Sequence, residues 1–269
     1  MKVYLLQRSI EWEDPSANFD AIDSALAQAP PERESLLVLA EMFSTGFSLA
    51  LDKVGEPEAG PSSEFLRYLS QKYGTCTVGS FPYRPLDEEK GLNRLMAYYP
   101  DGTPAVAYDK IHPFSYGKEA DFYRGGTCLP LFGFRGWTIC PTVCYDLRFP
   151  EMYRRAAIVG GADLLLCIAN WPTPRRDHWN TLLRARAIEN QAVMVAVNRV
   201  GQDPLNDYSG ESAVVDARGR ELLSLGEQAA VGCTVLDREE LLEWRARFPA
   251  LTDATEQFEL LRCIAEDAP

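Results

Sequence analysis

An α/β fold with mixed β-sheets covered by helices is predicted by three features of this 269-residue sequence. Short apolar runs of strand length alternate with helix-length segments near both ends of the chain. Hairpin signals interrupt this alternation in the middle, which indicates sheets with both parallel and antiparallel pairs. No Pro-, Gly- or Ser-rich linker divides the chain. We therefore predict a single domain over residues 1–269, with a C-terminal tail from about residue 249 that packs on a partner subunit.

The first part of the chain predicts strands separated by helices. Apolar residues recur at helical spacing in the first helical segment, and a continuous apolar run before Glu41 is typical of a buried strand. The predicted order is a strand at 3–7, a helix at 18–27, a strand at 35–40, a helix at 63–73 and a strand at 76–80.

The middle and the last part predict hairpins as well as further helices. Pro100-Asp101-Gly102-Thr103 favours a tight turn between strands at 93–99 and 105–109. A second hairpin enters a strand at 137–144 through Phe134-Arg135-Gly136. The remaining elements are a helix at 149–159 ended by Gly160-Gly161, a strand at 163–169, a helix at 178–190, a strand at 192–198 and a hairpin around 216–219.

The acidic composition argues against nucleic acid as a partner. Asp and Glu number 39 against 27 Lys and Arg, which gives a formal net charge of −12. Nucleic-acid binding depends largely on clustered Lys and Arg. The same charge repels anionic ligands at long range, so an anionic substrate requires local cations.

The N-terminal residues and the cysteines predict a cytoplasmic protein. The start, residues 1–6, has the pattern of a strand rather than of a secretory signal, and no run approaches membrane-spanning length. Seven cysteines are an odd number, and several lie in apolar strand-like contexts, which is unlike a secreted disulfide framework.

Three polar residues of reactive types stand at the ends of predicted strands. They are Glu41, Lys110 and Cys144. In open α/β sheets, sites gather at the carboxyl ends of strands, so these residues form a candidate constellation. Each residue taken alone is more often structural, because a lone cysteine is usually a small buried residue and a lone Glu or Lys a surface charge. Only their joint arrangement favours catalysis.

The sequence around these residues resembles the nitrilase superfamily of carbon-nitrogen hydrolases. The resemblance lies in Ala40-Glu41-Met42-Phe43, Tyr108-Asp109-Lys110, Cys144-Tyr145-Asp146-Leu147-Arg148-Phe149-Pro150-Glu151, Ala169-Asn170-Trp171-Pro172, Arg184 to Gln191 and Asn198-Arg199-Val200-Gly201. It extends from Met1 to about Ala254 and is strongest to the bacterial omega-amidases. One departure is Ala40, where the family commonly has proline. The resemblance implies a four-layer αββα sandwich, no cofactor, and a homodimer or larger homo-oligomer.

The resemblance also implies a mechanism that suits the chemistry of an amide. A covalent thioester divides amide hydrolysis into two easier steps, and it requires a thiolate to attack. Cys144 is the implied nucleophile, Glu41 the general acid and base, and Lys110 the cation that favours the thiolate and the oxyanion. The backbone N–H of Tyr145 is the second oxyanion donor. Glu119 matches a supporting glutamate, although a surface Glu is the ordinary interpretation.

The implied substrate is the monoamide of a short dicarboxylic acid, such as 2-oxoglutaramate or succinamate. Arg148 is the first candidate for binding the distal carboxylate, with a structural ion pair to Glu151 or Asp146 as the alternative. Asn170 and Trp171 are expected either to line the pocket or to form a turn. Phe114, together with Tyr116 and Phe122, is expected either to form a lid or simply to pack.

Two other functions stay open at this stage. One is an amidase for another acyl group, such as deaminated glutathione or an N-carbamoyl amino acid. The other is a catalytically silent scaffold or binding protein with the same fold. Metal binding has little support, because His112 and His178 are the only histidines and no paired-ligand motif occurs.

Overall fold

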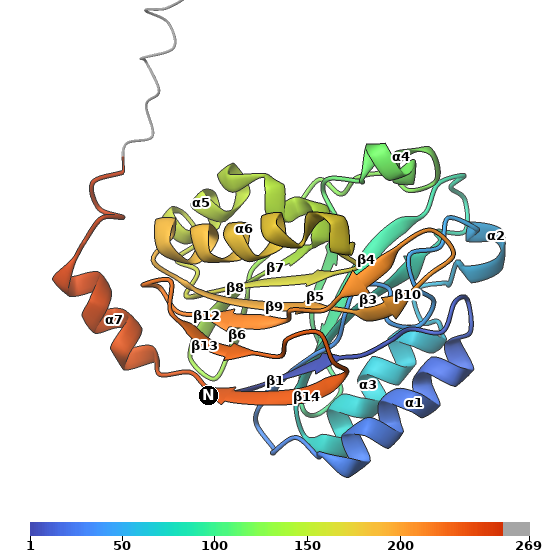
Figure 1. Ribbon diagram of the computed structural model, residues 1–269, viewed down its shortest axis with the longest axis horizontal. Helices are drawn as coiled ribbons and strands as arrows, with labels where there is room; N and C mark the ends of the chain where they lie inside the picture. The colour runs from blue at the N-terminus through green and yellow to red at the C-terminus, as the bar shows by residue number, and fades with distance from the viewer. Residues whose placement is uncertain (255–269) are drawn as a thin grey trace, which may run out of the picture.

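Two six-stranded β-sheets lie face to face in the computed structural model, which describes residues 1–254 (Figure 1). Helices cover the outer face of each sheet, so the layers follow the order helix, sheet, sheet, helix. This arrangement confirms the predicted four-layer αββα sandwich with mixed sheets. Residues 255–269, most of the predicted C-terminal tail, lie outside the described residues.

The first sheet has a parallel centre and antiparallel edges. β1, β2 and β3 are parallel to one another, whereas β4 and β5 continue the sheet as antiparallel strands and β14 pairs antiparallel with β1. In spatial order the strands are β14 (Ala230–Val235), β1 (Lys2–Gln7), β2 (Leu36–Val38), β3 (Cys76–Tyr83), β4 (Leu92–Tyr98) and β5 (Pro104–Asp109).

The second sheet repeats this plan. Its centre is formed by the parallel strands β7, β8 and β9, and its edges are antiparallel. The order is β13 (Glu221–Ser224), β12 (Ala213–Val215), β9 (Val193–Asn198), β8 (Leu164–Ala169), β7 (Trp137–Val143) and β6 (Phe132–Phe134). A separate two-stranded ribbon joins β10 (Val200–Gln202) to β11 (Asp207–Ser209).

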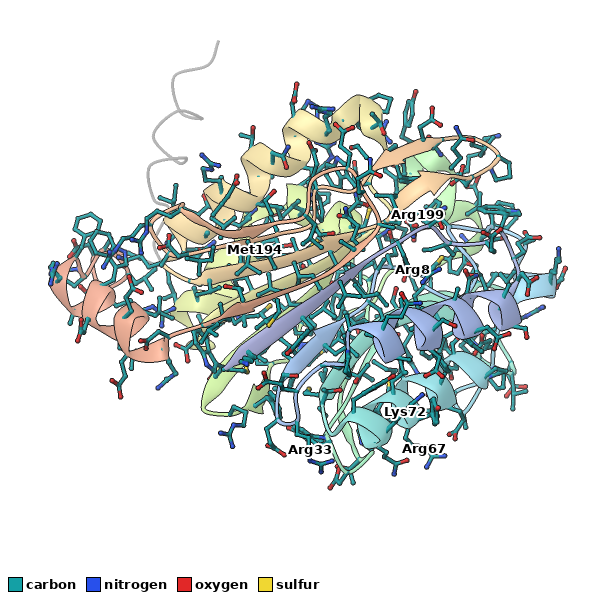
Figure 2. The ribbon with its side chains drawn as sticks, turned by 60° about the horizontal axis from the view of Figure 1, so that its bottom comes forward. Arg8, Arg33, Arg67, Lys72, Met194 and Arg199 are labelled. Atoms are coloured by element: carbon teal, nitrogen blue, oxygen red, sulfur yellow. The ribbon has the colours of Figure 1, made fainter. Side chains whose placement is uncertain are left out.

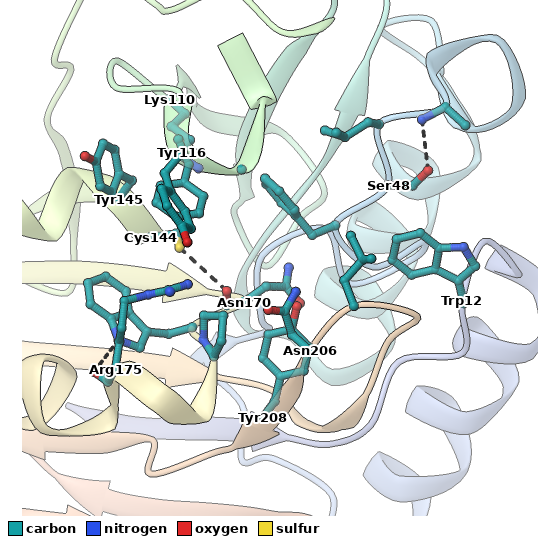
Figure 3. Close-up of a pocket in the computed structure, with 18 of the residues that line it drawn as sticks. Trp12, Ser48, Lys110, Tyr116, Cys144, Tyr145, Asn170, Arg175, Asn206 and Tyr208 are labelled. Carbon is teal, nitrogen blue, oxygen red and sulfur yellow. Dashed lines mark hydrogen bonds between the residues drawn. The ribbon is translucent and has the colours of Figure 1, made fainter. Parts of the chain in front are cut away.

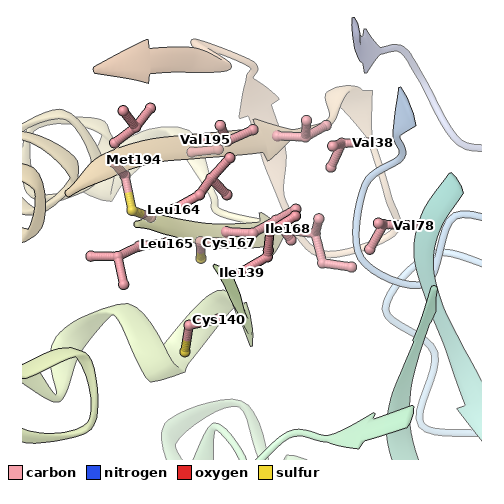
Figure 4. Packing of buried hydrophobic residues seen from close by; sticks show 14 of the residues in the cluster. Val38, Val78, Ile139, Cys140, Leu164, Leu165, Cys167, Ile168, Met194 and Val195 are labelled. Atoms are coloured by element: carbon pink, nitrogen blue, oxygen red, sulfur yellow. The ribbon is translucent and has the colours of Figure 1, made fainter. Parts of the chain in front are cut away.

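Successive side chains of a strand point to opposite faces of its sheet, so each strand contributes to two apolar layers, one between the sheets and one under the outer helices. On β1, Val3 and Leu5 point into the core between the sheets, and Tyr4 and Leu6 point toward the outer helices. The inner core is filled by branched residues from both sheets, as Figure 4 shows for Val38, Val78, Ile139, Ile168 and Val195. The central strands β8 and β9 of the second sheet are buried on both faces, because helices also cover its outer side.

The helices begin and end where the local sequence favours it. α1 starts at Pro15 after Asp14, whose side chain accepts the N–H of Ala17 at 3.0 Å, and α3 ends at Gly74 with φ +66°. The α-helices are α1 (Pro15–Gln28), α2 (Leu51–Val54), α3 (Pro61–Tyr73), α4 (Glu119–Phe122), α5 (Pro150–Ile158), α6 (Arg176–Glu189) and α7 (Arg238–Arg247). Short 3₁₀ helices span Ser115–Gly117, Cys144–Arg148 and Thr173–Arg175.

Basic side chains on the helical surface are paired with acidic ones rather than gathered for a polyanion. Arg67 and Lys72, labelled in Figure 2, contact Glu64 and Asp23. None of the helices in residues 1–254 combines the length and apolarity that a membrane crossing requires.

Candidate active site

Glu41, Lys110 and Cys144 lie at or just beyond the carboxyl ends of strands. β2 ends at Val38, three residues before Glu41, and Lys110 and Cys144 directly follow β5 and β7. The first two strands belong to one sheet and β7 to the other. The three residues therefore come together where the two sheets meet.

A buried cluster joins one ammonium group to two carboxylates. Lys110 Nζ lies 3.1 Å from Glu41 Oε1 and 2.8 Å from Glu119 Oε2. Asn93 Nδ2 donates to Glu41 Oε1 at 2.7 Å and to Glu119 Oε1 at 3.3 Å. The side chains of Lys110, Glu41 and Glu119 are at most 1% exposed. Glu119 is therefore not a surface residue, and the structure places it beside Lys110.

In this cluster, burial shifts the pKa of Lys110 and that of Glu119 one way, and the opposite charges beside each group shift it the other way. Burial alone lowers the pKa of Lys110, but the negative charges of Glu119 and Glu41 outweigh it and hold that pKa well above its ordinary value. Burial raises the pKa of Glu119, although the charge of Lys110 opposes this. Lys110 is thus held as a cation at the base of the site.

Replacing Lys110 by methionine is expected to destabilise the fold strongly. Lys110→Met keeps the length of the side chain but leaves two buried carboxylates without their ammonium partner. Breaking a buried pair in this way typically costs about 3–5 kcal/mol in the free energy of unfolding. The matched control is Lys72→Met, which removes an ion pair whose side chains are 32% and 36% exposed and should cost about 1 kcal/mol or less. Equal losses of the two variants in urea denaturation would contradict the buried ion cluster.

The other oxygen of Glu41 is fixed from the second sheet. The backbone N–H of Asn170 donates to Glu41 Oε2 at 2.7 Å, and Asn170 Nδ2 donates to the carbonyl oxygen of Glu41 at 2.8 Å. Asn170 directly follows β8 and also lines the pocket. Its position serves both the orientation of Glu41 and the pocket wall.

Cys144 occupies a sharp strand-to-helix turn. Its φ is +49°, a strained value for a residue with a side chain, and it begins the 3₁₀ helix Cys144–Arg148. Asp146 holds this turn, because its carboxylate accepts the N–H of Val143 at 3.0 Å and the hydroxyl of Tyr108 at 2.6 Å. It also accepts the N–H of His112 at 3.1 Å. The turn is thereby tied to the loop that follows Lys110.

Burial and the neighbouring charges act together on the pKa of the Cys144 thiol. Burial raises its pKa well above the ordinary value, the charge of Glu41 raises it further, and the charge of Lys110 lowers it. Lys110 thus shifts the pKa of the thiol in the predicted direction, but burial and Glu41 outweigh it and the pKa rises. Formation of the thioester therefore calls for a base that takes the thiol proton as the sulfur attacks.

A cavity of about 440 Å³ opens above Cys144 (Figure 3). Lys110, Cys144 and Asn170 form its floor, and aromatic side chains dominate its walls. The predicted pocket residues Phe114, Tyr145, Arg148 and Trp171 all line it, as does Tyr116. Phe122 does not line it, so of the two alternatives left open for these aromatic residues, the lid does not apply to Phe122.

Phe114 and Trp171 also carry structural contacts. The N–H of Phe114 donates to Glu119 Oε2 at 2.5 Å, and its ring lies 5.0 Å from that of Tyr145. The indole N–H of Trp171 donates to the carbonyl oxygen of Arg175 at 2.8 Å. Phe114 therefore both lines the pocket and packs against its neighbours, and Trp171 both lines the pocket and holds the turn that follows it.

Two arginines line one side of the cavity without acidic partners. Within residues 1–254, neither Arg148 nor Arg175 has a carboxylate within 4.0 Å, so the predicted alternative of an ion pair from Arg148 to Glu151 or Asp146 is wrong. The guanidinium of Arg148 stacks 4.7 Å from the ring centre of Trp171, and that of Arg175 lies 5.4 Å from Phe114. Burial and the charge of Arg175 both lower the pKa of Arg148. Arg148 and Arg175 therefore give this side of the cavity a positive charge that no carboxylate of residues 1–254 neutralises.

Three residues of the site escaped the sequence argument. Asn93, Asp146 and Arg175 contact the ion cluster, the cysteine turn and the pocket respectively. A polar Asn inside the apolar run of β4 is the one local signal that pointed to a role. Among the described residues, no group of three or more His, Cys, Asp or Glu side chains is arranged to hold a metal ion.

A four-layer αββα sandwich with a thiol, an ammonium group and two carboxylates at one pocket defines the class of hydrolases that cleave carbon–nitrogen bonds. The model of the carbon-nitrogen hydrolase family matches residues 2–246, and the chain belongs to this family. The predicted membership is therefore confirmed.

Named relatives and a solved structure agree with this assignment. The chain is 39% identical over 264 residues to "Omega-amidase YafV" of Yersinia enterocolitica, covering 97% of this chain and 99% of that protein. It is 32% identical to "2-oxoglutaramate amidase" of Bacillus subtilis, covering 92% and 95%. The fold matches XC1258 from Xanthomonas campestris, a CN-hydrolase superfamily protein with an arsenic adduct in its active site, with a TM-score of 0.89, 39% identity, and 96% and 98% coverage.

Proposed function

We propose that this enzyme hydrolyses the ω-amide of short dicarboxylic acid monoamides, of the 2-oxoglutaramate or succinamate type, to the acid and ammonia. One observation carries the substrate class: the pocket above Cys144 also holds the guanidinium groups of Arg148 and Arg175, neither of which has a carboxylate partner in residues 1–254. A substrate with an amide at one end and a carboxylate at the other can place the amide at Cys144 and the carboxylate at the arginines. The names of the omega-amidase and 2-oxoglutaramate amidase relatives support this proposal.

In the first half of the reaction, Cys144 Sγ attacks the amide carbon. The thiol proton passes to Glu41, because burial and the charge of Glu41 raise the pKa of the thiol and a base has to accept its proton. The oxyanion that forms is stabilised by Lys110 Nζ and the backbone N–H of Tyr145, the residue after the strained Cys144. Glu41 then returns the proton to the departing nitrogen, the C–N bond breaks, and a thioester remains.

In the second half, water replaces ammonia at the same place. Glu41 takes a proton from water, the hydroxide attacks the thioester carbon, and the same two donors hold the oxyanion. Collapse releases the acid and returns the proton to the sulfur. Glu119 and Asn93 are positioning residues in this scheme, since they contact Lys110 and Glu41 rather than the reacting atoms.

The arginines are expected to discriminate by the distal charge of the substrate. Arg175→Gln should lower kcat/KM for succinamate by about 10- to 100-fold, mainly through KM, because a hydrogen bond to a charged group contributes about 1.5–3 kcal/mol. Butyramide has the same chain but no distal carboxylate, and its kcat/KM should change by less than about threefold. A parallel loss for both amides would mean that Arg175 does not bind the carboxylate.

The proposed function is tested by ammonia release from a panel of substrates. We expect 2-oxoglutaramate and succinamate to be hydrolysed with much higher kcat/KM than glutamine or simple nitriles. The α-amino cation of glutamine is repelled by the two arginines, and a simple nitrile has no distal carboxylate for them to bind. A preference for a nitrile or for glutamine would overturn the ω-amide assignment.

We further infer a homodimer or larger homo-oligomer in the cytoplasm. Apolar side chains are exposed on β14 and after α7, with Val235 at 61% and Phe248 at 55%, and such residues gather at interfaces. The six cysteines of the described residues are unpaired, as in a reducing compartment. Light scattering of the purified chain tests the assembly, and a monomeric mass would contradict it.

A further inference from the structure

The cavity extends well beyond the space that a short dicarboxylic monoamide needs. Figure 3 shows Tyr145 and Arg175 on one side of Cys144, and Ser48 and Trp12 on the opposite side. We call the part of the cavity on the side of Ser48 and Trp12 the distal arm, and assign to it the lining residues Trp12, Phe47, Leu49, Leu205 and Tyr208 together with the polar Glu13, Ser48 and Asn206. These side chains are largely apolar, whereas succinamate and 2-oxoglutaramate are polar at both ends. The proposed substrates thus leave the distal arm without an occupant.

The chemistry of the reaction directs the leaving nitrogen toward the distal arm. Glu41 has to protonate that nitrogen, and the loop immediately after Glu41 carries Phe47 and Leu49 into the arm. Phe47 also lies beside the ion cluster, with its ring centre 5.5 Å from Lys110 Nζ. The distal carboxylate of the substrate is held on the other side by the arginines. A substituent on the nitrogen would therefore extend along Phe47 and Leu49.

The outer rim of the distal arm is held open by a fixed turn. Leu205 is 85% exposed, yet its N–H and that of Asn206 both donate to Asp203 Oδ1 at 2.7 Å. The other oxygen of Asp203 accepts the hydroxyl of Tyr208 at 2.5 Å. Leu205 also lines the cavity, so a group that enters the distal arm can contact it.

The charge of the distal arm restricts its ligand. Glu13 lines the cavity near Trp12, where Ser48 and Lys53 already satisfy its carboxylate at 2.6 Å each. An anionic substituent, such as the dipeptide part of deaminated glutathione, would meet this carboxylate. A neutral apolar group would meet only the aromatic and aliphatic wall.

We propose that the distal arm binds a neutral alkyl or benzyl group on the amide nitrogen, so that the enzyme also hydrolyses N-substituted ω-amides. The reaction is the one described above: the C–N bond breaks, the thioester forms, and Glu41 passes the thiol proton to the leaving amine instead of to ammonia. Water then hydrolyses the same thioester. This inference rests on the proposed function and adds the leaving-group class to it.

The experiment compares succinamate with N-methyl-, N-propyl- and N-benzylsuccinamate, measuring amine release by the full chain. From N-methyl to N-propyl, kcat/KM should rise about fourfold for each added CH₂ that reaches the arm, because burial of a CH₂ contributes about 0.8 kcal/mol. A steady fall with the size of the substituent would overturn the inference. Hydrolysis of succinamate would then still support the proposed function. Failure on all four amides would instead contradict both the proposed function and the binding of a substituent in the distal arm.

A variant of Leu205, at the exposed rim of the distal arm, tests whether the substituent on the amide nitrogen binds there. Leu205→Asp should lower the ratio of kcat/KM for N-benzylsuccinamate over succinamate by about tenfold, since it places a charge beside the apolar group. Leu86→Asp is the matched control, because Leu86 is 95% exposed and does not line the cavity, and the ratio should stay within about twofold. An unchanged ratio in Leu205→Asp would show that the substituent lies elsewhere and would overturn the proposal.

Discussion

Cys144→Ala is expected to abolish turnover of 2-oxoglutaramate and to leave no covalent acyl-enzyme. The sulfur is the only reacting atom that the proposed mechanism takes from the protein into a bond with the substrate. Without it, the remaining donors can polarise the amide but have nothing to deliver to its carbon. Removal of a nucleophile in another hydrolase cost on the order of 10⁶ in kcat. We therefore expect ammonia release at the level of the buffer blank and no added mass after an acid quench.

The control for this loss is a cysteine of the same chain that lies away from the pocket. Cys128 is exposed and free and does not line the cavity. Cys128→Ala should keep wild-type turnover and the same acyl-enzyme mass. Residual turnover in Cys144→Ala above a hundredth of wild type would place the nucleophile elsewhere.

The positions of the main site residues followed from local patterns together with the resemblance. A continuous apolar run ended by a polar residue is visible in the sequence at Glu41, Lys110 and Cys144, and the carboxyl ends of strands are where sites gather. What the pattern could not supply is contact between them. The 3.1 Å from Lys110 Nζ to Glu41 Oε1 joins residues that are 69 positions apart. Their meeting depends on how the sheets are ordered.

Residues whose roles depend on distant contacts were the ones that the sequence missed. Asp146 is one of many acids in the chain, and only the fold shows its carboxylate between the cysteine turn and His112. Arg175 lies in a short 3₁₀ helix with no periodic pattern. The strand-like context of Cys233 pointed to β14, but its bounds were not predicted, since half-exposed Ala230–Val235 becomes a strand by pairing with β1 at the other end of the chain.

Helix α7 was not predicted because its sequence is mostly polar and lacks a repeating apolar pattern. Of its ten residues only Leu241 is buried, so the apolar spacing that predicts a helix is absent. Its start is nevertheless encoded locally, because Asp237 accepts the N–H of Glu239 at 2.9 Å. Capping residues were thus a better guide to this helix than periodicity.

Glu41→Gln is expected to lower kcat for 2-oxoglutaramate by about 10²–10⁴-fold. A positioned general acid and base contributes about this factor, and the amide of glutamine cannot take the thiol proton or activate water. The substitution keeps the shape of a side chain that is fully buried between Asn93, Lys110 and Asn170. Steady-state kinetics on protein with an unchanged circular dichroism spectrum measures the effect. A loss below about tenfold would assign the proton transfers to another group.

The same variant should make the thiol easier to ionise although it is less active. The negative charge of Glu41 raises the pKa of Cys144, and the charge of Lys110 lowers it. Removing the first charge and keeping the second shifts the balance toward the thiolate, so the pKa falls. The pH midpoint for alkylation of Cys144 by iodoacetamide should therefore move to lower pH in Glu41→Gln than in wild type. Damage to packing alone would lower kcat without this downward shift, so an unmoved or higher midpoint would contradict Glu41 as the charged partner that receives the thiol proton.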